Sequence, residues 1–263
     1  MKKPHVLITN DDGIDSYFLQ VLVEAHLPHF RVSVAAPAGE QSWIGRAFSR
    51  LREVRAERVR EAGFDAWAVD GTPSDCVNIA LGHLLEERPD AVISGINIGF
   101  NATMPLSLSS GTLAGAVEGA GWGLPAVAFS LMLPNEKFEG IRLRQGQTEG
   151  ETRESLQAAA ARAVAFTQTA LARRKTAVRM VVDNVNFPEQ CREETPVERT
   201  VPAVLPWGSL YRRDAAGSFR FKWQRGDTIL NAEENTDVAC LERGNISHSV
   251  LDYAALGRAE EIC

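Results

Sequence analysis

Two adjacent carboxylates, Asp11 and Asp12, follow a short apolar run at residues 6–8 that has the pattern of a buried parallel strand. Neighbouring acids repel each other, so both stay ionised only when a cation or hydrogen-bond donors lie between them. In an open α/β sheet, ligands bind at the carboxyl ends of the strands. The pair therefore predicts a site for a divalent cation such as Mg²⁺. Taken alone, Asn10 to Gly13 is equally typical of a turn before a helix.

Polar side chains also follow two other predicted strands. Gln41 and Ser42 lie in the loop after the second strand, and Asn97 and Asn101 come after a later one. Because the carboxyl ends of parallel strands meet at one edge of a sheet, we expect these groups to lie near the two aspartates. A divalent ion takes about six oxygen ligands, so two carboxylates, a hydroxyl and an amide carbonyl leave room for water and substrate.

A further element of the same pattern is the segment Ser109 to Thr112, which opens a predicted helix of small residues. Free N–H groups and the helix dipole favour an anion at such a terminus, and hydroxyls add donors. Strand-end acids, a metal and a helix-borne anion site together indicate metal-assisted phosphoryl hydrolysis. Plain helix capping and a tight turn at residues 95–99 are the simpler alternatives. A Walker A sequence and a G-x-G-x-x-G pattern are both absent, so ATP hydrolysis and dinucleotide binding lose their usual support.

The remaining polar motifs have structural interpretations. Thr72, with Pro73 at the first helical position and Asp75 three residues after Thr72, predicts a capping box. His248 lies late in a strand-like run and is a candidate for acid catalysis. The other histidines are expected to be surface or core residues, because no partner lies at a metal-like spacing: His5, His26, His29 and His83.

Elements that alternate in type position these residues. Predicted strands cover residues 6–9, 31–36, 90–95, 125–130 and 178–182, and predicted helices cover 17–27, 73–85, 109–120 and 154–173. This alternation over residues 1–188 predicts an α/β core with a mostly parallel sheet and right-handed crossovers. Residues 46–63 are expected to form exposed strands or a hairpin, and residues 134–151 a mobile loop. Residues 189–263 change to a β-rich pattern and are expected to form an extension used for self-association.

Composition excludes several classes of protein. The 263 residues carry a net charge of −6, which argues against polymeric nucleic acid as a partner. The four cysteines are far apart and make no C-x-x-C pair, so neither a zinc site nor a disulfide framework is indicated. No signal-peptide pattern and no run of roughly 18 apolar residues occurs. We therefore expect a cytoplasmic protein that does not bind membranes.

Several separated motifs, in order, resemble the SurE survival-protein family of 5′/3′-nucleotidases. They are Thr9 to Gly13, Ala36-Pro37 followed by Gln41-Ser42, Gly71 to Val77, Ser94 to Asn97 with Gly99 and Asn101, Ser110 to Thr112 with Glu118-Gly119, Asn184 to Pro188, and Thr236-Asp237. The resemblance covers most of the chain, and the combination of motifs is specific.

The resemblance implies a Rossmann-like three-layer core and hydrolysis of nucleoside monophosphates to nucleoside and phosphate. It also implies one Mg²⁺ or Mn²⁺ per subunit, and a homodimer or homotetramer formed through the C-terminal extension. Carried over position by position, the metal ligands would be Asp11, Asp12, Ser42 and Asn97, and the phosphate would be bound by Asn101, Ser110, Gly111 and Thr112. Asn10 is also predicted to bind substrate. Asp11, Asp12 and Asn101 are the predicted catalytic residues, and the sequence does not choose between ligand, base and nucleophile for the two acids.

Two segments depart from the family pattern. Residues 102–109 are apparently one residue longer than usual and contain no acid, and the tail at residues 245–250 lacks the usual Ile-Thr-Pro-Leu ending. Two other functions therefore remain open from the sequence. One is N-glycoside hydrolysis of nucleosides, which also uses strand-end aspartates, around a calcium ion. The other is nucleotide binding without catalysis, or with altered specificity.

Overall fold

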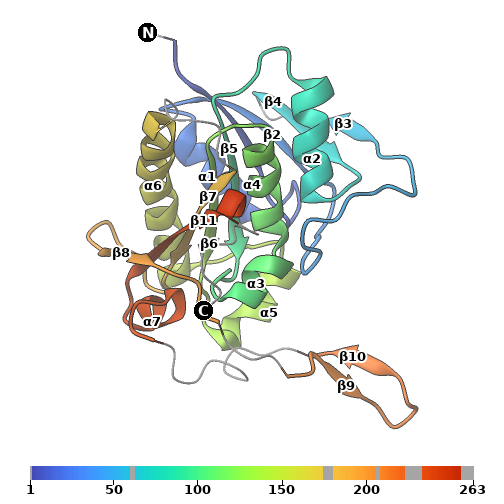
Figure 1. The fold of residues 1–263 in the computed structure, drawn as a ribbon, viewed down its shortest axis with the longest axis vertical. Coiled ribbons are helices and arrows are strands. Elements are labelled where there is room, and N and C mark those ends of the chain that lie inside the picture. The colour runs from blue at the N-terminus through green and yellow to red at the C-terminus, as the bar shows by residue number, and fades with distance from the viewer. Residues whose placement is uncertain (1, 60–62, 174–179, 205–207, 223–232, 256–263) are drawn as a thin grey trace.

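The computed structural model describes residues 2–59, 63–173, 180–204, 208–222 and 233–255, and it confirms an α/β fold built on a mostly parallel sheet (Figure 1). The strands of the main sheet lie in the order β3-β4-β2-β1-β5-β6-β7-β11-β8. Their bounds are β1 His5–Thr9, β2 Arg31–Pro37, β3 Ala56–Arg58, β4 Asp65–Val69, β5 Ala91–Ile98, β6 Ala126–Leu131, β7 Val181–Phe187, β8 Val197–Thr200 and β11 Ile246–Asp252.

The six strands from β4 to β7 in this order are parallel to one another. Two pairings in the sheet are antiparallel: β3 with β4, and β11 with β7. From β1 the chain builds the sheet outward through β2 and β4, and from β5 it builds in the opposite direction through β6 and β7. The switch point therefore falls between β1 and β5, where ligands bind in open α/β sheets.

Helices cover both faces of the sheet (Figure 1). Their bounds are α1 Tyr17–His26, α2 Pro73–Ile79 continued by a π-helix Ala80–Leu84, α3 Met104–Ser109, α4 Gly111–Gly121, α5 Asn135–Leu143, α6 Gly150–Ala172, α7 Asp237–Glu242 and a 3₁₀ turn Tyr253–Ala255. Alternate residues of β1 separate the two layers: Val6 and Ile8 pack with α1 and α6, whereas Leu7 packs with α2. Burial of all five β1 residues explains its apolar run.

Helix α4 lies unusually close to the sheet because it presents glycines to it. A Cβ added at Gly115 would lie 2.8 Å from Thr9 Cγ2, and one added at Gly119 would lie 2.5 Å from Val92 Cβ. The capping box predicted at the start of α2 is confirmed, with the Thr72 hydroxyl accepting from Asp75 N and the Asp75 carboxylate accepting from Thr72 N. The glycines therefore fix how near the N-terminus of α4 comes to the end of β1.

Three predicted boundaries were wrong. The loop predicted at residues 134–151 contains α5 and the start of α6, because Phe138 and Ile141 pack against the core despite the polar, glycine-rich sequence around them. Strand β5 continues past Gly95 to Ile98 through a register shift, with a positive φ of 129° at that glycine. Residues 184–187 lie inside β7 rather than after it.

Beyond residue 188, the chain contributes to two sheets. Strands β8 and β11 extend the main sheet, and β9 (Tyr211–Arg213) pairs with β10 (Phe219–Phe221) in a separate antiparallel ribbon.

Parts of the predicted elements lie outside the described residues, namely residues 60–62, 174–179, 205–207, 223–232 and 256–263. The domain boundary at 188 and self-association through the extension stay predictions. In the described ranges, no helix is both long enough and apolar enough to cross a lipid bilayer.

The close packing of α4 gives a stability prediction. Gly119→Ala is expected to destabilise the protein by about 1–3 kcal/mol, because the new methyl group would overlap Val92. Gly140→Ala, in α5, is the matched control: a Cβ there meets nothing within 4 Å, so it should stabilise by about 0.5–1 kcal/mol. Urea unfolding of both variants measures the difference, and equal stabilities would contradict the close packing.

Candidate active site

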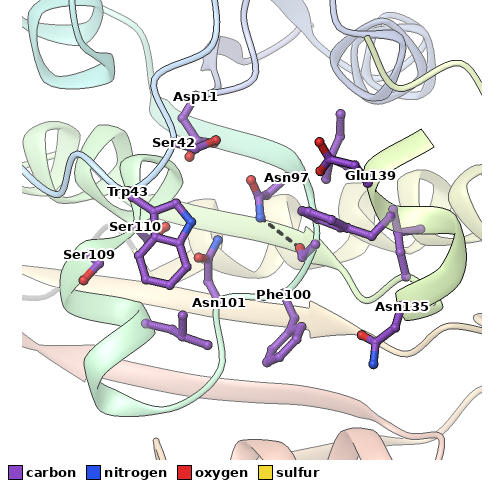
Figure 2. Close-up of a pocket in the computed structure, with 15 residues that line it drawn as sticks. Asp11, Ser42, Trp43, Asn97, Phe100, Asn101, Ser109, Ser110, Asn135 and Glu139 are labelled. Carbon is purple, nitrogen blue, oxygen red and sulfur yellow. Dashed lines mark hydrogen bonds between the residues drawn. The ribbon is translucent and has the colours of Figure 1, made fainter. Parts of the chain in front are cut away.

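A cavity of about 550 Å³ opens at the switch point between β1 and β5 (Figure 2). Polar groups line one part of it and apolar side chains another. The lining residues are Asp11, Ser42, Trp43, Asn97, Ile98, Gly99, Phe100, Asn101, Leu106, Ser109, Ser110, Leu133, Asn135, Phe138 and Glu139. The sequence predicted that the polar residues after β1, β2 and β5 lie close together, and these three segments do meet at one edge of the sheet.

Asp11 leaves the end of β1 and points at the start of α4. Its Oδ1 accepts the Thr112 hydroxyl at 2.7 Å, and the side chain is only 4% exposed. A Cβ at Gly111 would lie 2.7 Å from the Asp11 Cβ, so only glycine permits this approach. The backbone N–H of Thr112 also stabilises the carboxylate. The helix terminus is therefore directed in part at Asp11 itself.

Asp12 points toward β5, where its Oδ2 accepts from the Ile98 N–H at 3.0 Å. Burial raises the pKa of Asp11 to about 6. Burial, and then the neighbouring charge of Asp11, raise the pKa of Asp12 well above its ordinary value. In the described residues neither carboxylate forms an ion pair, and Arg142, whose charge lowers the pKa of Asp12, pairs with Glu40 and Glu139 instead. A bound cation would favour the ionised form of both carboxylates.

Neutral oxygens stand beside the two acids. The Asn97 Nδ2 donates to Gly99 O at 2.9 Å, and Figure 2 shows its amide oxygen turned toward Asp11 and Ser42. The Ser42 hydroxyl donates to Glu40 Oε1 at 2.8 Å, so its lone pairs remain available. Within the described ranges no cluster of three His, Cys, Asp or Glu is placed to hold a metal. A metal here would combine the two carboxylates with hydroxyl and amide oxygens, the donors that Mg²⁺ and Mn²⁺ prefer.

Ser110 is the N-cap of α4, and its Oγ accepts from Leu113 N at 3.0 Å. The hydroxyl proton remains free to point into the cavity that Ser110 lines. The helix predicted to open at residues 109–112 therefore begins at Gly111. Its first turn carries the free N–H groups that favour an anion.

Side chains of β7 bind both backbone polar groups of Asn101. Its backbone N–H donates to Asn186 Oδ1 at 2.7 Å, and its carbonyl accepts from Asn184 Nδ2 at 2.9 Å. Both asparagines are fully buried. The Asn101 side chain reaches Thr112 Oγ1 at 3.2 Å and Ser130 Oγ at 2.9 Å, which ties it to α4 and β6.

Five of the predicted residues are not among those that line the cavity: Asn10, Asp12, Gly111, Thr112 and His248. Asn10 is fully buried, and its side-chain amide bonds both the N–H and the carbonyl of Gly13, which shapes the turn after β1. His248 is buried on β11, with Nε2 2.6 Å from Asp183 Oδ1. Substrate binding by Asn10 and acid catalysis by His248 stay predictions.

The sequence analysis missed the apolar part of the cavity. Trp43, Phe100, Leu106 and Phe138 come from the loop after β2, the end of β5, α3 and α5. Residues 102–109, which depart from the family pattern, form the short helix α3 capped by Thr103. No periodic signal marks these residues, because a cavity wall collects single side chains from separate elements.

Comparison with known proteins decides the family. The family described as Survival protein SurE matches residues 6–204. The chain belongs to the SurE family. It is 33% identical to a protein named 5′-nucleotidase SurE from Methanosarcina barkeri, over 98% of this chain and 95% of that one. A second 5′-nucleotidase SurE, from Methanoculleus marisnigri, is 34% identical over 99% and 96% of the two chains.

A solved structure agrees with this assignment. The crystal structure of the SurE protein from Aquifex aeolicus superposes with a TM-score of 0.70 at 27% identity, covering 96% of this chain and 97% of that chain. The Rossmann-like arrangement expected from the resemblance is thus the SurE fold. Family membership is confirmed, and the roles of individual site residues stay predictions.

The raised pKa values of the two acids predict how stability depends on pH in the absence of metal. A carboxyl whose pKa is higher in the folded than in the unfolded state binds more protons when folded, so stability is lost as pH rises from about 4 through 6. Asp12→Asn should remove part of this loss. We expect the metal-free variant to be more stable than the wild type at pH 7.5 and equal to it near pH 3. Urea unfolding in EDTA measures this, and a wild type that is the more stable at pH 7.5 would contradict it.

Proposed function

We propose that this SurE-family chain is a divalent-metal-dependent phosphomonoesterase that hydrolyses nucleoside monophosphates to nucleoside and phosphate. The observation that carries the proposal is the adjacent pair of carboxylates at the end of β1: Asp11 is buried in the cavity wall beside the N-terminus of α4, and Asp12 is half-buried next to it. The names of the relatives support the nucleotide as substrate. Activity on both 5′- and 3′-monophosphates is part of the proposal.

The metal would be one Mg²⁺ or Mn²⁺ per subunit, held by Asp11, Asp12, Ser42 and Asn97. These residues fit it because they offer oxygen donors, among them two adjacent carboxylates that form no ion pair among the described residues. When bound, such an ion supplies charge stabilisation to a phosphoryl group and acidifies a bound water. Two carboxylates balance one dication, so the site stays able to accept an anion.

The phosphoryl group would lie against the first turn of α4. The Ser110 hydroxyl and the N–H groups of the first turn would donate to it, and the helix dipole favours the anion. Thr112 contributes indirectly, because its hydroxyl proton is donated to Asp11. Its effect is to orient the Asp11 carboxylate beside the phosphoryl group.

The apolar part of the cavity would take the nucleoside. Trp43, Phe100 and Phe138 offer aromatic surface, and Leu106 and Leu133 complete the wall. Bases stack on such side chains whatever their hydrogen-bonding edge. The polar groups at this end, Asn135 and Glu139, lie on exposed positions of α5, and Glu139 is paired with Arg142. We therefore propose that recognition of the base depends mainly on stacking.

Phosphate release from a panel of nucleoside 5′- and 3′-monophosphates tests the proposed function. Release should require Mg²⁺ or Mn²⁺, stop in EDTA, and fall by about 100-fold or more in Asp11→Asn. Asp15→Asn is the control, because Asp15 is an exposed carboxylate of the same loop that does not line the cavity. Release of ribose without phosphate would indicate a nucleoside hydrolase. Tight binding without turnover would indicate a binding protein.

Stacking on Trp43 can be tested separately. Trp43→Ala should raise KM for nucleoside monophosphates by about tenfold or more, because stacking contributes roughly 1–3 kcal/mol per base. KM for ribose 5-phosphate, which has no base, should not change. Phe48→Ala removes an exposed aromatic ring of the same loop that lies outside the cavity and should change neither value. An equal rise in KM for both substrates would contradict stacking by Trp43.

A further inference from the structure

The polar atoms of Asn101 are almost all committed to partners within the protein. The backbone N–H and carbonyl are bound by Asn186 and Asn184, and the carbonyl also accepts the Ser107 hydroxyl at 3.2 Å. The side-chain Nδ2 carries two hydrogens and has two acceptors, Thr112 Oγ1 and Ser130 Oγ. The only polar atom left to contact a ligand is therefore the amide oxygen, Oδ1.

Thr112 fixes which way this amide points. A hydroxyl has one proton to donate, and the Thr112 proton goes to Asp11 Oδ1 at 2.7 Å. The Asn101 atom 3.2 Å from Thr112 Oγ1 must then be a donor, because an oxygen there would face lone pairs. The reversed amide is excluded whenever Asp11 is ionised. Nitrogen therefore faces the protein and oxygen faces the cavity.

The free amide oxygen is accessible to a ligand. Asn101 lines the cavity, and Figure 2 shows its side chain between Trp43 and Asn97. Within the described part of the chain Oδ1 accepts no hydrogen bond, and it is not one of the sealed, unpaired buried atoms. A phosphate monoester dianion offers only acceptor oxygens. Asn101 therefore has no donor with which to hold the phosphoryl oxygens, and its amide oxygen can contact only a hydrogen-bond donor or a cation. The proposed cation already takes its amide ligand from Asn97, which leaves a hydrogen-bond donor as the ligand of Asn101.

We propose that Asn101 binds the attacking water through its amide oxygen and does not bind the phosphoryl group. This inference rests on the proposed phosphatase function. The water donates one O–H to Asn101 Oδ1, and this hydrogen bond orients a lone pair of the water oxygen toward phosphorus. A bond forms between the water oxygen and phosphorus, and the bond between phosphorus and the ester oxygen breaks with its electron pair on that oxygen. One water proton ends on the nucleoside hydroxyl and the other stays on hydrogen phosphate, so the amide gains no proton.

Two asparagines of β7 act as positioning residues in this scheme. Asn184 and Asn186 bind the backbone carbonyl and N–H of Asn101, so the Asn101 Oδ1 atom keeps its position without a hydrogen bond of its own among the described residues. Each has a second amide atom that is buried without a partner, Asn184 Oδ1 and Asn186 Nδ2. Leaving buried polar atoms unpaired is costly, so their retention is consistent with the bonds they make to Asn101.

The test separates catalysis from phosphate binding. In Asn101→Ala, kcat should fall by about 100-fold, because misplacing a reacting group has this effect. The dissociation constant of inorganic phosphate, measured by calorimetry with Mg²⁺ present, should not change. Weaker phosphate binding with kcat preserved would overturn the proposal and make Asn101 a phosphate donor. A defect confined to nucleotides and absent with ribose-free phosphate esters would also overturn it, in favour of a ribose hydroxyl as ligand.

A milder variant covers the case in which Asn101→Ala does not fold. Ser130→Ala removes one acceptor of Nδ2 without touching Asp11 and should lower kcat by up to about tenfold, with phosphate affinity unchanged. Ser33→Ala is the matched control. Ser33, on β2, is also a buried serine, and its side-chain partner is His5. It should change neither quantity. An unchanged kcat in Ser130→Ala, or a loss of phosphate affinity, counts against the proposal.

The phosphate-binding measurement also keeps the two proposals distinguishable. If the wild type binds phosphate but releases none from any monophosphate, the proposed function fails. Equal phosphate affinity of wild type and Asn101→Ala would still show that Asn101 is not a phosphate donor. If the wild type is active and Asn101→Ala loses phosphate affinity, the proposed function stands and the assignment of Asn101 fails.

Discussion

Two adjacent carboxylates at the end of β1, Asp11 buried and Asp12 half-buried, are the constraint on which the rest of the site depends. Burial raises the pKa of both Asp11 and Asp12, and their proximity adds to the effect on Asp12. A fold keeps such a pair only if donors and a cation compensate it. Thr112 and the Ile98 N–H supply the donors, and in the function that we propose the neighbouring amide and hydroxyl oxygens would help to hold the cation.

Close packing of α4 on the sheet makes this compensation possible. Gly111, Gly115 and Gly119 each lie where a Cβ would overlap a neighbouring residue. Without that approach, the Thr112 hydroxyl would not reach Asp11 and the first turn of the helix would not border the cavity. The same helix thus stabilises the Asp11 carboxylate and brings its first turn to the edge of the cavity. A stripe of small residues, unremarkable as a helix pattern, sets the depth of the active site.

A chain of hydrogen bonds connects β7 to the Asp11 carboxylate. Asn184 and Asn186 hold Asn101, whose amide donates to Thr112, which donates to Asp11. The backbone N–H and carbonyl of Asn101 fix the direction of the two bonds to Asn186 and Asn184, and the ionised Asp11 carboxylate fixes the direction of the bonds through Thr112 to the Asn101 amide. The chemistry available at Asn101 is decided by these partners rather than by the residue type alone.

The sequence by itself determined the α/β class, the capping box at Thr72 and the polar segments that meet at one sheet edge. These features follow from local periodicity and from the rule that parallel strands end at the same edge. The family was also predictable, because its motifs are ordered along the chain. Tertiary structure alone decided the helix at residues 135–143, the continuation of β5 past Gly95 and the apolar wall that includes Trp43. It also decided which atom of Asn101 faces the cavity. These features depend on contacts between residues far apart in the chain, which local pattern does not encode.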